Sequence, residues 1–245
     1  MNRQEPKNRS LSVAVALVSA LLIAMPIQAA TVNGGVLTIN LNRDALIAGT
    51  DLDNFPDTPT ESFPICCRPS IYVEEFWDAS HARDTFDQLR ENNTPDLYDL
   101  VSDEISALGL QFGVNGAAIL PNVTGRKLKA TTFNFDPDNL FGTASGHIGL
   151  NGVIRFRVDV APPQNRIILG DLTLNYDPDM ANATPGRSGW VLTNHIVFDA
   201  GAFELFDVTT SLIGNNLTIS GNLGFGDGFD HLGATAARLA DTRIG

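Results

Sequence analysis

The sequence predicts a mainly β fold, an antiparallel sandwich or barrel of about seven to eight strands, with two short α-helices in the N-terminal half. Apolar and polar residues alternate in most segments after residue 110, as in strands that bury one face. Gly, Pro, Asn and Asp separate these segments at short intervals, which is typical of turns between strands. Because no internal repeat or linker interrupts the pattern, we expect a single β-rich domain over residues 30–245.

The clearest strand pattern spans residues 146–160. Alternate residues from Ile148 to Val160 are mostly apolar, whereas most of the residues between them, including Arg155 and Arg157, are polar. This pattern predicts a half-buried strand whose polar face meets water. Gly152 interrupts the apolar face and predicts a bend or a bulge.

Residues 1–29 have the features of a secretory signal peptide. Basic residues precede an apolar run from Leu11 to Ile27, and Ala29 provides a small residue at the expected cleavage point. We therefore expect a secreted protein, periplasmic or extracellular, with no membrane anchor in the mature chain. A transmembrane anchor is the alternative for this run, but the run is short and Ser and Pro interrupt it.

Three different elements are expected between residues 31 and 69. Apolar residues alternate over 37–41 and predict a strand, and residues 43–48 add a helical turn. Pro and Asp are dense over residues 50–69, which excludes a regular helix or a central strand. We expect a long loop there, and loops of that length are usually functional or disordered.

Residues 70–109 predict a helical insertion. Apolar residues recur at three- and four-residue steps over 70–90, which is typical of an amphipathic helix. A second helix is expected to begin at Thr94, a good N-cap, with Pro95 in its first turn and Gly109 at its end.

From Leu110 onward the period of the pattern changes to two, which predicts strands separated by turns. The expected strands cover residues 110–114, 131–135, 146–160, 167–176, 190–198, 203–208 and 217–225.

The charge balance excludes some partners. The formal net charge is −12 and the pI is about 4.6, and Lys and Arg do not cluster. Binding to nucleic acid depends on clustered cations at phosphates, so we expect no nucleic-acid partner. An acidic exported protein is more compatible with solubility and with divalent cations.

The two cysteines, Cys66 and Cys67, are adjacent. Two thiols do not make a disulfide framework, and structural zinc sites need four spaced ligands. In an oxidising compartment the pair can form a vicinal disulfide, bond to a second chain, or stay reduced.

Three acidic turns are candidate calcium sites, because Ca²⁺ takes six to eight oxygen ligands from flexible segments. The same residues are ordinary turn formers, so a purely structural role is the alternative. The candidate ligands are Asp136, Asp138, Asp177, Asp179, Asp227 and Asp230.

No catalytic motif is present in the sequence. The four histidines lack metal-site spacing, although His147 and His195 lie on the polar side of expected strands that could be neighbours. Glu74, Glu75 and His81 would share one face of the expected helix, where acid–base chemistry is conceivable. A solvated helix face predicts the same residues, and no nucleophile motif accompanies them.

Most aromatic side chains fall on the expected core faces. Packing is therefore the first interpretation, and lining of an apolar pocket is the alternative. The residues concerned are Phe76, Trp77, Phe133, Phe135, Phe156, Trp190 and Phe198.

Four short patterns, over residues 130–137, 143–150, 188–195 and 217–223, resemble those of exported bacterial proteins that carry a PEP-CTERM-type sorting tag. The resemblance covers most of the mature chain and implies an envelope or matrix location without a particular chemistry. The chain departs from the family at its end, where Pro-Glu-Pro, a terminal apolar helix and a basic end are missing. The resemblance then implies release rather than anchoring.

These observations favour a non-enzymatic exported protein of the cell envelope or extracellular matrix, which binds an envelope polymer or associates with itself. The alternative is a β module that binds a small ligand or Ca²⁺, with no other cofactor expected. A hydrolase that uses Glu74, Glu75 or His81 is the third hypothesis.

Overall fold

The computed structural model describes residues 29–50, 71–91, 104–119, 123–158, 166–183 and 187–226. The expected signal peptide, most of the loop over 50–69 with Cys66 and Cys67, and the ligands Asp227 and Asp230 lie outside these ranges. Within the described residues, no helix has both the length and the apolar composition needed to span a membrane.

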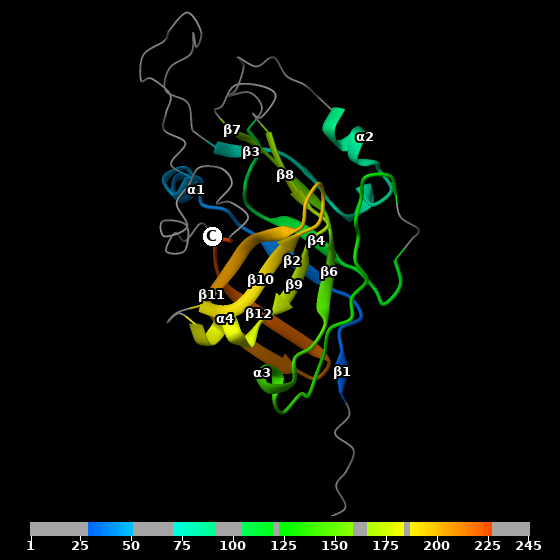
Figure 1. Cartoon of the computed structure of the whole chain (residues 1–245), viewed down its shortest axis with the longest axis vertical. Coiled ribbons are helices and arrows are strands. Elements are labelled where there is room, and N and C mark those ends of the chain that lie inside the picture. Colours follow the sequence, from blue (N-terminus) through cyan, green and yellow to red (C-terminus); the bar gives the residue numbers. More distant parts are fainter. Residues whose placement is uncertain are drawn as a thin grey trace, which may run out of the picture.

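A seven-stranded antiparallel sheet dominates the fold and curls into a half-barrel (Figure 1). In spatial order it contains β12 (Asn216–Phe225), β11 (Ala200–Ile213), β10 (Arg187–Asn194), β9 (Thr173–Tyr176), β6 (His147–Asn151), β4 (Leu110–Val114) and β2 (Val36–Ile39). The mainly β, antiparallel prediction is therefore confirmed.

Smaller elements complete the fold. A three-stranded antiparallel sheet joins β3 (Ile71–Trp77), β7 (Val153–Val158) and β8 (Arg166–Gly170), and β1 (Ala30–Thr31) pairs with β5 (Asn134–Phe135). The helices are α1 (Arg43–Thr50), α2 (Phe86–Glu91), α3 (Leu140–Thr143) and α4 (Pro178–Ala183), with a 3₁₀ turn over Ala79–His81.

Gly152 is where the chain passes from one sheet to the other. Its φ of +156° separates β6, in the large sheet, from β7, in the small sheet. A Cβ at this position would lie 2.6 Å from the ring of Phe112, so only glycine fits. The expected bend is confirmed, and it divides the expected long strand in two.

The expectation that the polar face of 146–160 meets water is wrong. Arg155 and Arg157 are 1% and 2% exposed, because the small sheet brings carboxylates of β3 against them. Alternation shows that two faces differ in polarity, but it does not show that the polar face is solvated.

The predicted helix over 70–90 is also wrong. Residues 71–77 form β3, which pairs with β7, and only the short 3₁₀ turn and α2 follow. Five of the seven residues in β3 are β-branched or aromatic, which favours a strand. The described end of the second expected helix, residues 104–109, is irregular rather than helical.

One main hydrophobic core lies between the inner face of the large sheet and the small sheet. Trp190, Phe133 and Tyr176 form a chain of aromatic contacts in it, with ring centroids 5.6 and 5.2 Å apart. Each aromatic residue comes from a different segment, so this cluster joins β9 and β10 to the strand-like segment before β5.

Candidate functional site

The inner face of the half-barrel holds a cavity of about 630 Å³. Its walls come from the N-terminal segment over 30–37, from the strands β6 and β9, and from the hairpin of β11 and β12. Apolar side chains make up most of the wall. They include Leu37, Val114, Ile148, Leu174, Leu217 and Ile219.

Strand alternation explains why these side chains reach the cavity. Leu217 and Ile219 line it, whereas Thr218 and Ser220, which lie between and after them on β12, are exposed. On β9, Leu174 faces the cavity. The same period therefore directs apolar side chains inward from several strands.

The mouth of the cavity carries exposed apolar side chains. Val36 and Leu212, which both line the cavity, are 60% and 36% exposed, and the adjacent Ile213 is 76% exposed. Exposed apolar side chains that are grouped around an opening are a feature of ligand-binding sites. The mouth is thus suited to an apolar molecule that enters from solvent.

The electrostatics of the cavity are simple. None of its described lining residues has an ionisable side chain. The polar side chains are those of Thr31, Asn33, Asn215 and Asn216. The cavity can therefore offer hydrogen bonds to a neutral group but no counter-charge to an ion.

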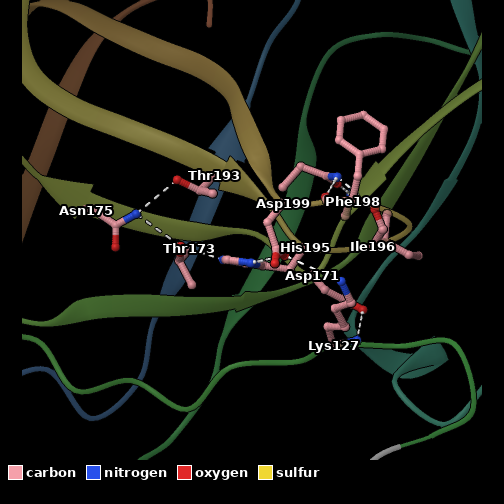
Figure 2. A network of polar contacts seen from close by, with 11 residues as sticks. Lys127, Asp171, Thr173, Asn175, Thr193, His195, Ile196, Phe198 and Asp199 are labelled. Atoms are coloured by element: carbon pink, nitrogen blue, oxygen red, sulfur yellow. Dashed lines mark hydrogen bonds and ion pairs between the residues drawn. The ribbon is translucent and has the colours of Figure 1, made fainter. Parts of the chain in front are cut away.

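The opposite face of the same sheet carries a polar network (Figure 2). The Nδ1 atom of His195 lies 2.9 Å from Asp199 Oδ1, and its Nε2 atom lies 3.0 Å from Thr173 Oγ1. Asn175 Nδ2 donates to Thr173 Oγ1 and to Thr193 Oγ1, at 3.1 and 3.2 Å. The register of β9 and β10 pairs Thr173 with Thr193, which puts these side chains on one face.

Asn194 fixes the turn that presents Asp199. Its Nδ2 donates to the carbonyl oxygens of Ile196 and Phe198, and its Oδ1 accepts from Gly170 N. The side chain is fully buried, so the turn is tied to both β8 and β10. The hydrogen bond from His195 then holds the pKa of Asp199 below its usual value.

The order carboxylate, imidazole, hydroxyl is also that of a nucleophilic triad. With Nδ1–H donated to Asp199, the Nε2 atom of His195 accepts the proton of Thr173. However, Thr173 is only 3% exposed and its oxygen also accepts from Asn175. A substrate carbonyl cannot reach a hydroxyl in that position, so the network stabilises the turn rather than performing catalysis.

His147 lies on the same face as His195, with β9 between their strands. Burial lowers the pKa of His147 below the usual 6.5, and the positive charges of His195 and Lys129 act in the same direction. The backbone hydrogen bond with Ala130 opposes this shift. The strands of the two histidines are therefore not adjacent, and Thr173 and Asn175 on β9 lie between them.

The lowered pKa of His147 predicts a pH dependence of stability. As the pH falls from about 7 to about 5, the unfolded chain takes up this proton before the folded chain does. The free energy of unfolding should therefore decrease over this pH range. In His147→Asn, which lacks the imidazole, the decrease should be smaller. Denaturant titrations at several pH values would measure it, with His81→Asn as the control, because His81 is paired with Asp84 near the surface. Equal pH slopes for His147→Asn and the wild type would contradict the assignment.

A buried ion pair holds the loop over 123–129. Arg126 Nη2 lies 2.6 Å from Asp171 Oδ1, and both side chains are at most 1% exposed. Arg126 Nη1 donates to the carbonyl oxygens of His81 and Asp84, and Lys127 N donates to Asp171 Oδ2. A charged residue, Asp171, within the mostly apolar run 167–174 was the sequence signal for this pair.

The glutamates of the proposed hydrolase site lie among arginines. Glu74 forms ion pairs with Arg155, Arg157 and Arg166 at 2.7–2.9 Å, and its side chain is 2% exposed. Glu75 contacts Arg155 at 2.6 Å, and burial, the dominant effect, raises its pKa. The helix face that was expected to carry them with His81 does not exist, because Glu74 and Glu75 belong to β3.

The described calcium candidates act within their own turns. Asp136 Oδ1 accepts from Asp138 N, and Asp177 Oδ1 accepts from the backbone N–H groups of Asp179 and Met180. These bonds are those of ordinary turns and helix caps. Among the described residues, no group of three or more His, Cys, Asp or Glu side chains is arranged to hold a metal ion.

Comparisons with known proteins give no relative: no family model, no curated protein and no solved structure matches the chain.

Proposed function

We propose that the protein is a non-enzymatic binding protein that holds an uncharged, apolar small molecule in the cavity of the half-barrel. The observation that carries this proposal is a cavity of about 630 Å³ with mainly apolar walls and no ionisable lining side chain among the described residues. Ligand sites in proteins have volumes of roughly 300–1,000 Å³ and few polar groups, and this cavity fits that description.

The walls favour a neutral ligand over a charged one. Moving an ion from water into an apolar site without a partner costs several kcal/mol or more. The cavity offers only the amide and hydroxyl groups of Thr31, Asn33, Asn215 and Asn216. A mostly apolar body with a neutral polar end, placed near these residues, is the ligand that the cavity suits.

The setting that we propose is the cell envelope or extracellular matrix. The signal-peptide features of residues 1–29 and the acidic composition support it. A protein that carries an apolar molecule through water outside the cytoplasm would account for both the cavity and the exported sequence. Fractionation of the producing cells would test the location independently of binding.

A neutral fluorescent probe, N-phenylnaphthylamine, tests the cavity directly. We expect saturable binding to the mature protein with a Kd of about 1–10 μM, and weaker binding of the anionic anilinonaphthalene sulfonate. Leu217→Asp places a charge inside the cavity and should weaken the neutral probe at least about tenfold.

The matched control is Thr218→Asp, which adds the same charge to the exposed face of the same strand. It should bind the probe as the wild type does. Equal binding by both variants, with circular dichroism showing that both are folded, would overturn the proposal. Absence of saturable binding to the wild type would also overturn it.

A further inference from the structure

The strand β12 ends the large sheet and leaves one of its own edges open (Figure 1). In the part of the chain that the structure describes, β12 is paired with β11 alone. It is ten residues long, and its residues 216–222 are exposed or only partly buried. The strand at the opposite end of the sheet, β2, has only four residues. A long edge strand presents a row of N–H and C=O groups that can pair with another chain.

The turn of the hairpin determines which backbone groups of β12 point outward. The loop over 214–215 has two residues, so Ile213 and Asn216 form a hydrogen-bonded pair across it. Hydrogen-bonded and non-hydrogen-bonded pairs alternate along an antiparallel ladder. The backbone N–H and C=O groups of Leu217 and Ile219 therefore point away from β11. Each of these two residues presents a donor and an acceptor at the open edge.

The edge lacks the features that normally prevent association. Natural sheets protect their edges with charged side chains, proline, bulges or very short strands. Residues 208–226 contain no charged residue and no proline. The register shift of the hairpin, between Phe206 and Thr209, inserts its extra residue into β11, so β12 itself runs without a bulge. The strand is therefore suited to accept a further strand.

A second copy of the chain is the partner that this edge fits. Two copies that each carry a net charge of −12 repel each other over most of their surface, but the uncharged segment over 208–226 allows a close approach. Antiparallel pairing about a two-fold axis lets the same edge serve both copies. The exposed side chains of Thr218 and Ser220 would then lie beside those of the other copy, and cross-strand pairs of hydroxyl side chains are favourable.

We propose that the mature protein forms a two-fold symmetric dimer in which the β12 strands of two copies pair antiparallel. The two large sheets then join into one continuous sheet. Leu217 and Ile219 supply the backbone groups that pair across the axis, while their side chains stay on the inner face, where they line the cavity. The dimer thus uses backbone groups at the edge and side chains on the outer face, and it does not depend on a ligand in the cavity.

Sedimentation velocity of the mature protein over about 1–100 μM tests the dimer. The background Cys66→Ser with Cys67→Ser excludes a disulfide between copies. We expect the dimer to be the main species at the upper end of the range. The double variant Thr218→Asp with Ser220→Asp places like charges opposite each other across the axis, so it should raise the Kd of the dimer at least about tenfold.

The matched control is Thr209→Asp with Ser211→Asp. These two exposed residues of β11 lie directly opposite Ser220 and Thr218, on the same face of the hairpin. The control therefore adds the same charge, one strand further from the edge. It should form the dimer as the background protein does.

A monomer throughout the concentration range would overturn the proposal. Equal dimerisation of the two double variants, with circular dichroism showing that both are folded, would overturn it as well. Binding of N-phenylnaphthylamine should be the same in both double variants, because neither changes a side chain that lines the cavity. A failure of the dimer is therefore distinguishable from a failure of the cavity proposal.

Discussion

Replacing Arg126 by methionine is expected to lower the free energy of unfolding by about 3–5 kcal/mol. The change leaves the carboxylate of Asp171 buried, with 0% of its side chain exposed, and removes its nearest cation. It also removes the donors to the carbonyl oxygens of His81 and Asp84, which the loop over 79–85 needs. Denaturant unfolding followed by circular dichroism would measure the loss.

The control is Arg90→Met, because Arg90 and Asp87 form an ion pair with side chains 59% and 66% exposed. Such surface pairs contribute about 0–1 kcal/mol. The double variant Arg126→Met with Asp171→Asn should lose less than the sum of the single changes, since asparagine carries no charge and tolerates the positive φ of 49° at this position. A loss no larger than that of Arg90→Met would show that the pair does not hold the loop.

The large sheet is the part of the fold that the sequence predicts best. Its strands bury one face, so polarity alternates, as in Leu110–Val114 and over residues 217–225. The bend at Gly152 is also predictable from the sequence, because a glycine that interrupts a strand pattern indicates a backbone position where no other residue fits. In the structure, only glycine is compatible with this φ and with the nearby ring of Phe112.

The small sheet could not be predicted in the same way. Arg155 and Glu74 are about 80 positions apart in the chain, and each alone resembles a solvated side chain. Their pairing depends on the contact between β3 and β7, which is a tertiary feature. The two adjacent glutamates of β3 also fit the polar face of an amphipathic helix. That pattern predicts a helix, whereas the β-branched and aromatic residues around them favour the strand that is observed.

The cavity illustrates another limit. Alternation indicates that Leu217 and Ile219 point inward, but it does not indicate whether other side chains fill the space that they face. That depends on how closely the hairpin of β11 and β12 approaches residues 30–37, at the other end of the described chain. Sequence patterns give the direction of side chains, whereas cavities arise from the distances between elements.

The second large effect is expected at Gly149, in the middle of β6. A Cβ there would lie 1.9 Å from the carbonyl oxygen of Lys129, which belongs to the backbone and has no rotamer to change. The covering loop is fixed over this point, since Asn115 Nδ2 donates to the same carbonyl and Gly149 N donates to Thr131 Oγ1. Gly149→Ala should therefore displace the loop and lower the free energy of unfolding by about 3 kcal/mol.

The displacement has a second, spectroscopic consequence that separates it from general destabilisation. Burial under this loop lowers the pKa of His147, so a displaced loop should let that pKa rise toward its usual value. A pH titration of the histidine ring signals by NMR would follow it. Gly34→Ala is the control, because no atom lies within 4 Å of the added Cβ and its φ is not positive, so stability should stay the same or increase slightly. If Gly149→Ala unfolds at the same denaturant concentration as Gly34→Ala, the loop does not lie against β6 as described. If it is destabilised while the pKa of His147 stays low, the burial of His147 has a cause other than this loop.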